Sequence, residues 1–123
     1  MSTVSLSAEL ISQSLERWKY NVTTEAELQS AVASALHVYS WPFREQVEIA
    51  PKDRIDFVVA FCIGVELKVK GSLAAVTRQL HRYALSDKIA ALVLVTTVHR
   101  LARVPRLLNG KRVHVVSLRP GLR

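Results

Sequence analysis

The N-terminal third of the chain shows the three- and four-residue apolar spacing of two amphipathic helices. Ser7 is expected to cap a first helix that runs to about Lys19. Thr24 followed by Glu27 is a capping-box pattern, and it predicts a second helix that runs to about Tyr39. The apolar side of the first helix is expected to consist of Leu6, Leu10, Ile11, Leu15 and Trp18. Each helix therefore has one side to bury.

The rest of the chain alternates strand-like and helix-like segments. Turn-prone residues separate three consecutive strand-like segments, and Gly71-Ser72 then opens a helix. The predicted segments are strands at about 44–49, 55–61 and 64–69, a helix at 73–85, a buried strand at 89–96, a short helix at 101–108 disturbed by Pro105, and a strand at 112–118. This order predicts a single α/β domain in which helices cover a mixed β-sheet.

The composition fits one folded domain. The chain has 123 residues, half of them hydrophobic, which is enough to bury a real core. The longest apolar run, Phe57 to Val65, falls well short of the roughly 20 residues that span a membrane. The N-terminus has no signal-peptide pattern, and a single cysteine excludes a disulfide framework. We therefore expect a soluble, cytoplasmic protein without a membrane partner.

The charge is strongly basic and unevenly distributed. Lys and Arg number 17 against 10 Asp and Glu, which gives a net charge of +7, and no acidic residue occurs between Thr97 and Arg123. Basic side chains placed on phosphates release condensed counterions, so this pattern favours a nucleic-acid partner. The residues expected to contact the phosphate backbone are Arg78, Arg82, Arg100, Arg103, Arg106, Lys111 and Arg112.

A charged pair interrupts the apolar pattern of the third predicted strand. Glu66 and Lys68 are two residues apart, so both side chains leave the same face of the sheet. Asp56 lies near the start of the preceding strand, and a short connection makes these strands an antiparallel hairpin in which Asp56 can sit beside Glu66. Two adjacent carboxylates repel, and a hard divalent cation relieves that repulsion. A neighbouring lysine can stabilise a developing phosphorane or orient a water molecule.

These residues, in this order, resemble the motifs of the PD-(D/E)xK nuclease superfamily. The matching elements are Arg54-Ile55-Asp56, the stretch from Gly64 to Lys68, and the helix that follows. That helix carries Gln79 and Tyr83 four residues apart on one face, which resembles the Q-x-x-x-Y motif of the RecB-like branch. The resemblance covers about residues 24–118. Ile55 stands where many members of the superfamily have proline.

The resemblance implies a fold and a metal site. The fold is a restriction-endonuclease-like core of αβββαβ order, preceded by an extra N-terminal helix. Asp56 and Glu66, aided by the backbone carbonyl of Leu67, would hold Mg²⁺ or Mn²⁺. Lys68 would act on the attacking water or the transition state. Gln79 and Tyr83 are expected to position the substrate or the site.

The resemblance also implies a further acidic residue on the helix before the strands, and Glu25 and Glu27 compete for this role. Glu25 shares the apolar stripe that contains Leu28 and is expected to face the sheet, whereas Glu27 is explained by the capping box. A Glu-x-Glu-Leu stretch in archaeal Holliday-junction resolvases resembles this region. Glu25 is therefore the expected fourth residue of the site.

The predicted function is Mg²⁺-dependent hydrolysis of DNA phosphodiester bonds, in DNA repair, recombination or the processing of phage and mobile-element DNA. Two alternatives are a homodimeric resolvase that cuts Holliday junctions and a non-catalytic DNA-binding module that keeps the nuclease fold. The chain contains no Gly-x-x-x-x-Gly-Lys phosphate loop, so no nucleotide cofactor is expected.

Overall fold

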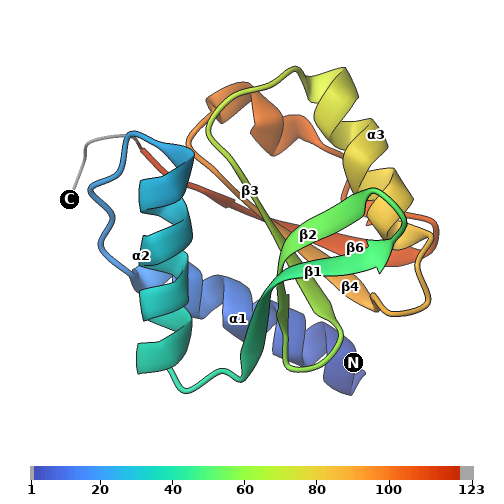
Figure 1. Ribbon diagram of the computed structural model, residues 1–123, viewed down its shortest axis with the longest axis horizontal. Helices are drawn as coiled ribbons and strands as arrows, with labels where there is room; N and C mark the ends of the chain where they lie inside the picture. The colour runs from blue at the N-terminus through green and yellow to red at the C-terminus, as the bar shows by residue number, and fades with distance from the viewer. Residues whose placement is uncertain (1, 120–123) are drawn as a thin grey trace.

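The computed structural model describes residues 2–119, which form a mixed α/β structure (Figure 1). Within these residues, one six-stranded sheet carries helices on both faces. The helices are α1 (Thr3–Arg17), α2 (Glu25–Val38) and α3 (Leu73–Ala84), with a short 3-10 helix η1 (His99–Arg103). The strands are β1 (Phe43–Ala50), β2 (Asp53–Val59), β3 (Ile63–Lys68), β4 (Ala91–Thr96), β5 (Leu107–Leu108) and β6 (Lys111–Ser117).

The sheet is mixed, as predicted, and its strand order is β1-β2-β3-β4-β6-β5. Short turns join β1, β2 and β3, which are antiparallel. The pairs β3–β4 and β4–β6 are parallel, because longer segments containing α3 and η1 connect their strands. The β2–β3 pairing runs from Val59↔Ile63 to Phe57↔Val65. The predicted hairpin is therefore confirmed.

Buried apolar side chains fill two clusters, one on each face of the sheet. α1 and α2 cover the face that carries Val65 and Leu67, whereas α3 and η1 cover the face that carries Leu92 and Leu94 (Figure 1). Because side chains alternate along a strand, Glu66 points to the α3 side. The prediction that Val65 and Leu67 are buried under helices on the opposite face is confirmed.

The first helix begins earlier than the sequence predicted. It starts at Thr3, because the side chain of Ser2 accepts the backbone N–H of Ser5 at 3.0 Å and caps the helix. Ser7 lies inside α1 and is not its N-cap.

The buried side of α1 also differs from the predicted apolar stripe. Leu6 and Leu10 are 48% and 42% exposed. The small residues Ala8 and Ser12 are buried in their place, together with Ile11 and Leu15. The side of α1 that packs on the sheet is therefore lined by small as well as large side chains, and Leu6 and Leu10 lie outside it.

The starts of α2 and α3 follow their capping residues. The side chain of Thr24 accepts the N–H of Glu27, and the Glu27 carboxylate accepts the N–H of Thr24, so the predicted capping box is confirmed. Ser72 caps α3 through the N–H of Ala75. None of the helices within residues 2–119 is long and apolar enough to cross a membrane.

The predicted short helix at residues 101–108 is wrong. The chain forms η1 instead, continues through an extended Val104 (φ −54°, ψ 147°), and then forms β5, which pairs antiparallel with the start of β6. Pro105 has no backbone N–H and disfavours the helical conformation of the residue before it. Asn109 and Gly110 have φ of 50° and 75°, which is the geometry of a tight hairpin turn between β5 and β6.

Gly64 is a point of close packing in β3. A Cβ at this position would lie 2.5 Å from Cδ1 of Ile55 and 3.0 Å from Cδ2 of Leu92, both on side chains buried in the core. We expect Gly64→Ala to lower the free energy of unfolding by about 1–3 kcal/mol, because an overpacked core forces its neighbours to move. Urea denaturation measures the change. A variant as stable as the natural protein would contradict this packing.

Candidate active site

Asp56 and Glu66 lie where β2 and β3 stop pairing. The last pair is Phe57↔Val65, and beyond it each carboxylate binds the backbone of the opposite strand. The N–H of Asp56 donates to Oε1 of Glu66 at 3.2 Å, and the N–H of Leu67 donates to Oδ2 of Asp56 at 2.8 Å. These two bonds take the place of sheet hydrogen bonds. The structure therefore brings together the two carboxylates that the sequence predicted as neighbours.

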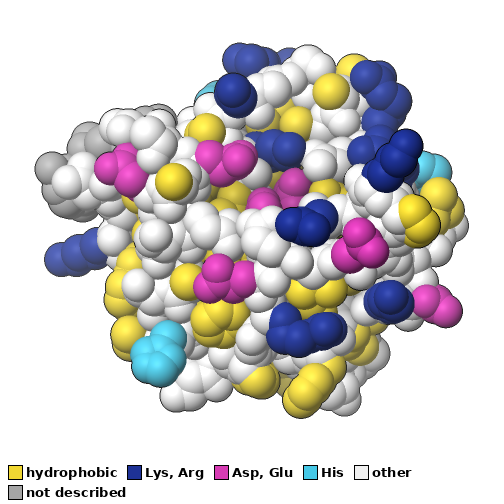
Figure 2. Space-filling model, in the orientation of Figure 1, with side chains coloured by type: hydrophobic (Ala, Val, Ile, Leu, Met, Phe, Trp, Pro, Cys, Tyr) yellow, Lys and Arg dark blue, Asp and Glu magenta, His cyan; other side chains and the backbone are white. Residues whose placement is uncertain are grey.

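Lys68 completes the predicted group of three residues. Its Nζ lies 3.6 Å from Oε2 of Glu66, and its side chain is 21% exposed. Its backbone carbonyl accepts the hydroxyl of the buried Thr96 at 2.8 Å and the N–H of Thr97 at 3.2 Å. The end of β4 thus fixes the end of β3, which carries the lysine. Figure 2 shows acidic side chains set back in the middle of this face, with Lys or Arg side chains beside them.

The carboxyl group of Glu66 is in an unusual environment. The residue is only 4% exposed. Burial disfavours its charged form and is the main cause of a raised pKa, the nearby Asp56 carboxylate raises it further, and Lys68 lowers it. The result is a shift in the pKa of Glu66 from 4.5 to about 8. As long as no cation other than Lys68 lies beside it, the carboxyl group of Glu66 therefore retains its proton at neutral pH.

The helix α3 places Gln79 and Tyr83 at the carboxylate pair. The Tyr83 hydroxyl lies 3.0 Å from the backbone carbonyl of Arg54 and 3.4 Å from Oε2 of Glu66. The side-chain amide of Gln79 donates to the same hydroxyl at 2.8 Å. Burial raises the pKa of Tyr83, and the charges of Glu66 and Asp56 raise it further, so the hydroxyl keeps its proton. Tyr83 contacts the site directly, whereas Gln79 acts on it through Tyr83.

Two residues at the site were not singled out in the sequence. Gln46, on β1, donates its side-chain amide to Oδ1 of Asp56 at 3.4 Å. Thr96 has its hydroxyl buried against the end of β3. The only signal for Thr96 was a polar residue at the end of an apolar strand. Gln46 gave no signal, because it stands among other polar residues of an exposed strand.

The oxygen donors fit a hard divalent cation with few protein ligands. Among residues 2–119, no group of three or more His, Cys, Asp or Glu side chains is close enough to hold a metal ion. Mg²⁺ commonly binds one or two carboxylates and keeps several water molecules, whereas structural zinc sites need four protein ligands. Asp56 and Glu66 are therefore the two carboxylates that could hold Mg²⁺, and the Leu67 carbonyl remains the expected third oxygen.

Glu25 does not join this pair. It was expected to face the sheet, but its side chain is exposed, and no cluster of three acidic residues forms in the described part of the chain. The reason lies in the position of Glu25 at the first turn of α2, where residues 23–27 are all exposed and the apolar stripe begins only at Leu28. Glu27 accepts hydrogen bonds from Thr23 and Thr24, in agreement with a capping role.

Four of the predicted phosphate-contacting residues lie on the same side of the sheet as Glu66. Arg78 and Arg82 are exposed on α3, and Arg100 and Arg103 are exposed on η1. Arg82 forms an ion pair with Asp53 at 3.2 Å, and Arg100 donates to the carbonyl of Gly71 at 3.0 Å. Figure 2 shows Lys and Arg side chains gathered over α3 and the upper rim of this face.

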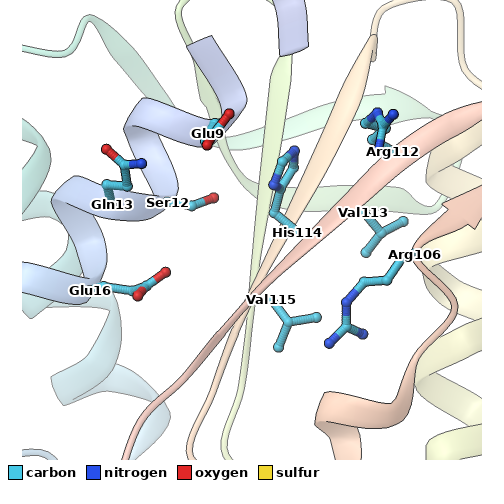
Figure 3. A pocket seen from close by; sticks show the side chains of 9 residues that line it. All are labelled: Glu9, Ser12, Gln13, Glu16, Arg106, Arg112, Val113, His114 and Val115. Atoms are coloured by element: carbon cyan, nitrogen blue, oxygen red, sulfur yellow. The ribbon is translucent and has the colours of Figure 1, made fainter. Parts of the chain in front are cut away.

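Two of the other three basic residues, Arg106 and Arg112, lie elsewhere. Arg106 and Arg112 line a groove of about 440 Å³ between α1 and β6 (Figure 3). Glu9 and Glu16 of α1 line the same groove, so its walls carry both signs of charge. Lys111 donates to the backbone carbonyl of Ser86 at 2.7 Å. The predicted set of basic residues therefore does not form one continuous surface around the carboxylate pair.

Comparisons with known proteins do not extend this description. No protein family, curated protein or solved structure shows a significant match to the chain. The resemblance to PD-(D/E)xK nucleases thus rests on the motifs and the geometry described above, and membership of that superfamily stays a prediction.

Proposed function

We propose that this chain is a Mg²⁺-dependent deoxyribonuclease with a restriction-endonuclease-like core. The observation that carries the proposal is the carboxylate pair at the open end of the β2–β3 hairpin. Asp56 and Glu66 are held there by reciprocal backbone hydrogen bonds, with the ammonium group of Lys68 3.6 Å from Glu66. The order of α2, β1, β2, β3, α3 and β4 supports the proposed core, since it matches the αβββαβ order of that fold.

The residues of the site have separate tasks in this proposal. Asp56 and Glu66 would hold the divalent ion, which would supply electrophilic activation of the phosphodiester. Lys68 stabilises the negative charge that develops on the phosphate oxygens, because its ammonium group is fixed in a poorly solvated position beside Glu66. Tyr83 holds Oε2 of Glu66 from the helix side, and Gln79 holds Tyr83.

DNA would approach over α3 and η1. The exposed Arg78, Arg82, Arg100 and Arg103 lie on the face of the sheet to which Glu66 points. Arginine side chains on phosphates give affinity without reading the base sequence. We therefore expect binding that weakens steeply with salt and depends little on sequence.

A cleavage assay over several DNA structures tests the proposed function. Linear duplex, single-stranded and four-way-junction DNA are incubated with the protein in Mg²⁺ and in EDTA, beside the Asp56→Ala, Glu66→Ala and Lys68→Ala variants. We expect the natural protein to cleave at least one substrate in Mg²⁺ and none in EDTA. All three variants should lose cleavage while largely retaining their folding and their DNA affinity. Cleavage by all three variants would show that the site is assigned wrongly.

The substrate that is cut separates the alternatives. Degradation from free ends or of single strands by a monomer would identify a RecB-like enzyme. Symmetric cutting of the four-way junction by a dimer, with the mass measured in solution, would identify a resolvase. DNA binding without cleavage of any substrate and without binding of Mn²⁺ would contradict the nuclease proposal and leave a DNA-binding module.

A further inference from the structure

Gln46 interrupts β1 directly opposite Asp56. The neighbouring residues form the pairs Glu45↔Phe57 and Val47↔Ile55, but no pair is formed by Gln46 and Asp56 between them. Gln46 has a φ of 52°, in the left-handed region that residues other than glycine rarely adopt. The chain needs no turn here, because the strand continues in the same register on both sides. The direction of the strand therefore does not explain the positive φ of Gln46.

The side chain of Gln46 supplies a donor to the carboxylate pair. Its Nε2 lies 3.4 Å from Oδ1 of Asp56, while Oδ2 of Asp56 accepts the N–H of Leu67 at 2.8 Å. Within residues 2–119, Oδ1 has no other hydrogen-bond donor. Each carboxylate oxygen has two lone pairs, so both oxygens keep one acceptor site for a cation after these bonds form.

We infer that Gln46 is a positioning residue that holds Asp56 ready for a divalent cation, an inference that rests on the proposed function. Glu66 is fixed by burial and by contacts with Tyr83 and Lys68, whereas the Asp56 side chain is partly exposed and, within residues 2–119, is held by the two hydrogen bonds from Gln46 and Leu67. Groups that hydrogen-bond to a metal ligand orient it, and their loss typically weakens metal binding by about 10- to 100-fold. Residues held in unfavourable backbone conformations without a turn to explain them often lie at functional sites.

Two variants separate the side chain of Gln46 from its strained backbone. Gln46→Gly removes the donor and also relieves the positive φ. Gln46→Met removes the donor, keeps the length of the side chain and keeps the strain. The matched control is Lys52→Gly, because Lys52 has a φ of 67° at the exposed β1–β2 turn and is not among the hydrogen-bond or ion-pair partners of Asp56 and Glu66. Mn²⁺ is titrated into each metal-free protein by calorimetry, and thermal unfolding gives the Tm.

We expect both Gln46 variants to bind Mn²⁺ about 10-fold more weakly than the natural protein. The Tm of Gln46→Gly should equal or exceed that of the natural protein, because the strain is relieved. Lys52→Gly should likewise have a Tm equal to or above that of the natural protein, but its Mn²⁺ affinity should be unchanged. Weaker binding with a lower Tm in Gln46→Gly would assign a structural role to Gln46 and overturn the inference.

The same titration distinguishes this inference from the proposed function. If the natural protein binds no Mn²⁺, the proposed function itself fails. If the natural protein binds Mn²⁺ and cuts DNA, and both Gln46 variants bind Mn²⁺ equally well, only the role of Gln46 is wrong.

Discussion

Replacing Glu66 by glutamine is expected to abolish Mg²⁺-dependent cleavage and, at the same time, to stabilise the metal-free protein above neutral pH. Loss of one of the two carboxylates removes several kcal/mol of transition-state stabilisation, which corresponds to a rate at least about 10³-fold lower. The amide should keep the contacts of the carboxyl group, because its oxygen can accept the N–H of Asp56 and its nitrogen can donate to Tyr83.

The stabilisation follows from the raised pKa of Glu66. Between its ordinary value of 4.5 and about 8, the folded protein holds a proton that the unfolded chain has released. The free energy of unfolding therefore falls as the pH rises through this window and levels off above it. With about 1.4 kcal/mol for each pKa unit, we expect the natural protein to lose roughly 3 kcal/mol between pH 5 and pH 8. Glu66→Gln has no such proton and should lack this loss.

Urea denaturation in EDTA at pH 5 and pH 8 measures this effect. Glu48→Gln is the matched control, because it removes an acidic side chain from an exposed position on β1 and should leave the pH dependence unchanged. Equal pH dependence in Glu66→Gln and the natural protein would mean that Glu66 is ionised at neutral pH in the folded protein, contrary to its buried position.

Lys68→Ala should lower kcat by about 10²- to 10³-fold while leaving Mn²⁺ binding and DNA affinity close to those of the natural protein. The ammonium group is expected to act on charge that is present only in the transition state, so its loss affects the rate more than ground-state binding. Single-turnover cleavage at saturating enzyme gives the rate, and calorimetry gives the Mn²⁺ affinity.

Lys70→Ala provides the control for charge. Lys70 is exposed and follows Lys68 by two residues, so this variant removes the same charge from nearly the same region without touching Glu66. If Lys70→Ala lowers the rate as much as Lys68→Ala, the effect reflects general attraction of DNA, and Lys68 has no specific role.

The hairpin and its residues could be predicted because short-range rules decide them. The alternation of β3 requires that Glu66 and Lys68 share a face, and the short turn before β3 requires antiparallel pairing with β2. The four-residue spacing of Gln79 and Tyr83 likewise requires that they share a face of α3, and the hydrogen bond between them reflects this spacing.

The exposed position of Glu25 could not be predicted from such short-range rules. Helical phase correctly relates Glu25 to Leu28, but it does not show where along α2 the contact with the sheet begins. That limit is set by the lengths and tilts of neighbouring elements. The same long-range packing buried Ala8 and Ser12 on α1 in place of Leu6 and Leu10.

In the C-terminal region, a local turn pattern decides the structure in place of the predicted helix. Asn109-Gly110 is a strong turn pattern, and it specifies the β5–β6 hairpin that replaced the predicted helix. The separation of Arg106 and Arg112 from the carboxylate pair then follows, because the hairpin directs these residues toward α1. A run of basic residues in the sequence does not predict a single basic surface.

Tyr83 couples the packing of α3 to the carboxylate pair. One hydroxyl lies within 3.4 Å of both the backbone carbonyl of Arg54 on β2 and the carboxylate of Glu66 on β3, so it links α3 to both strands of the hairpin. Detachment of α3 from the sheet would break both contacts of Tyr83, so the Glu66 side of the site depends on the packing of α3.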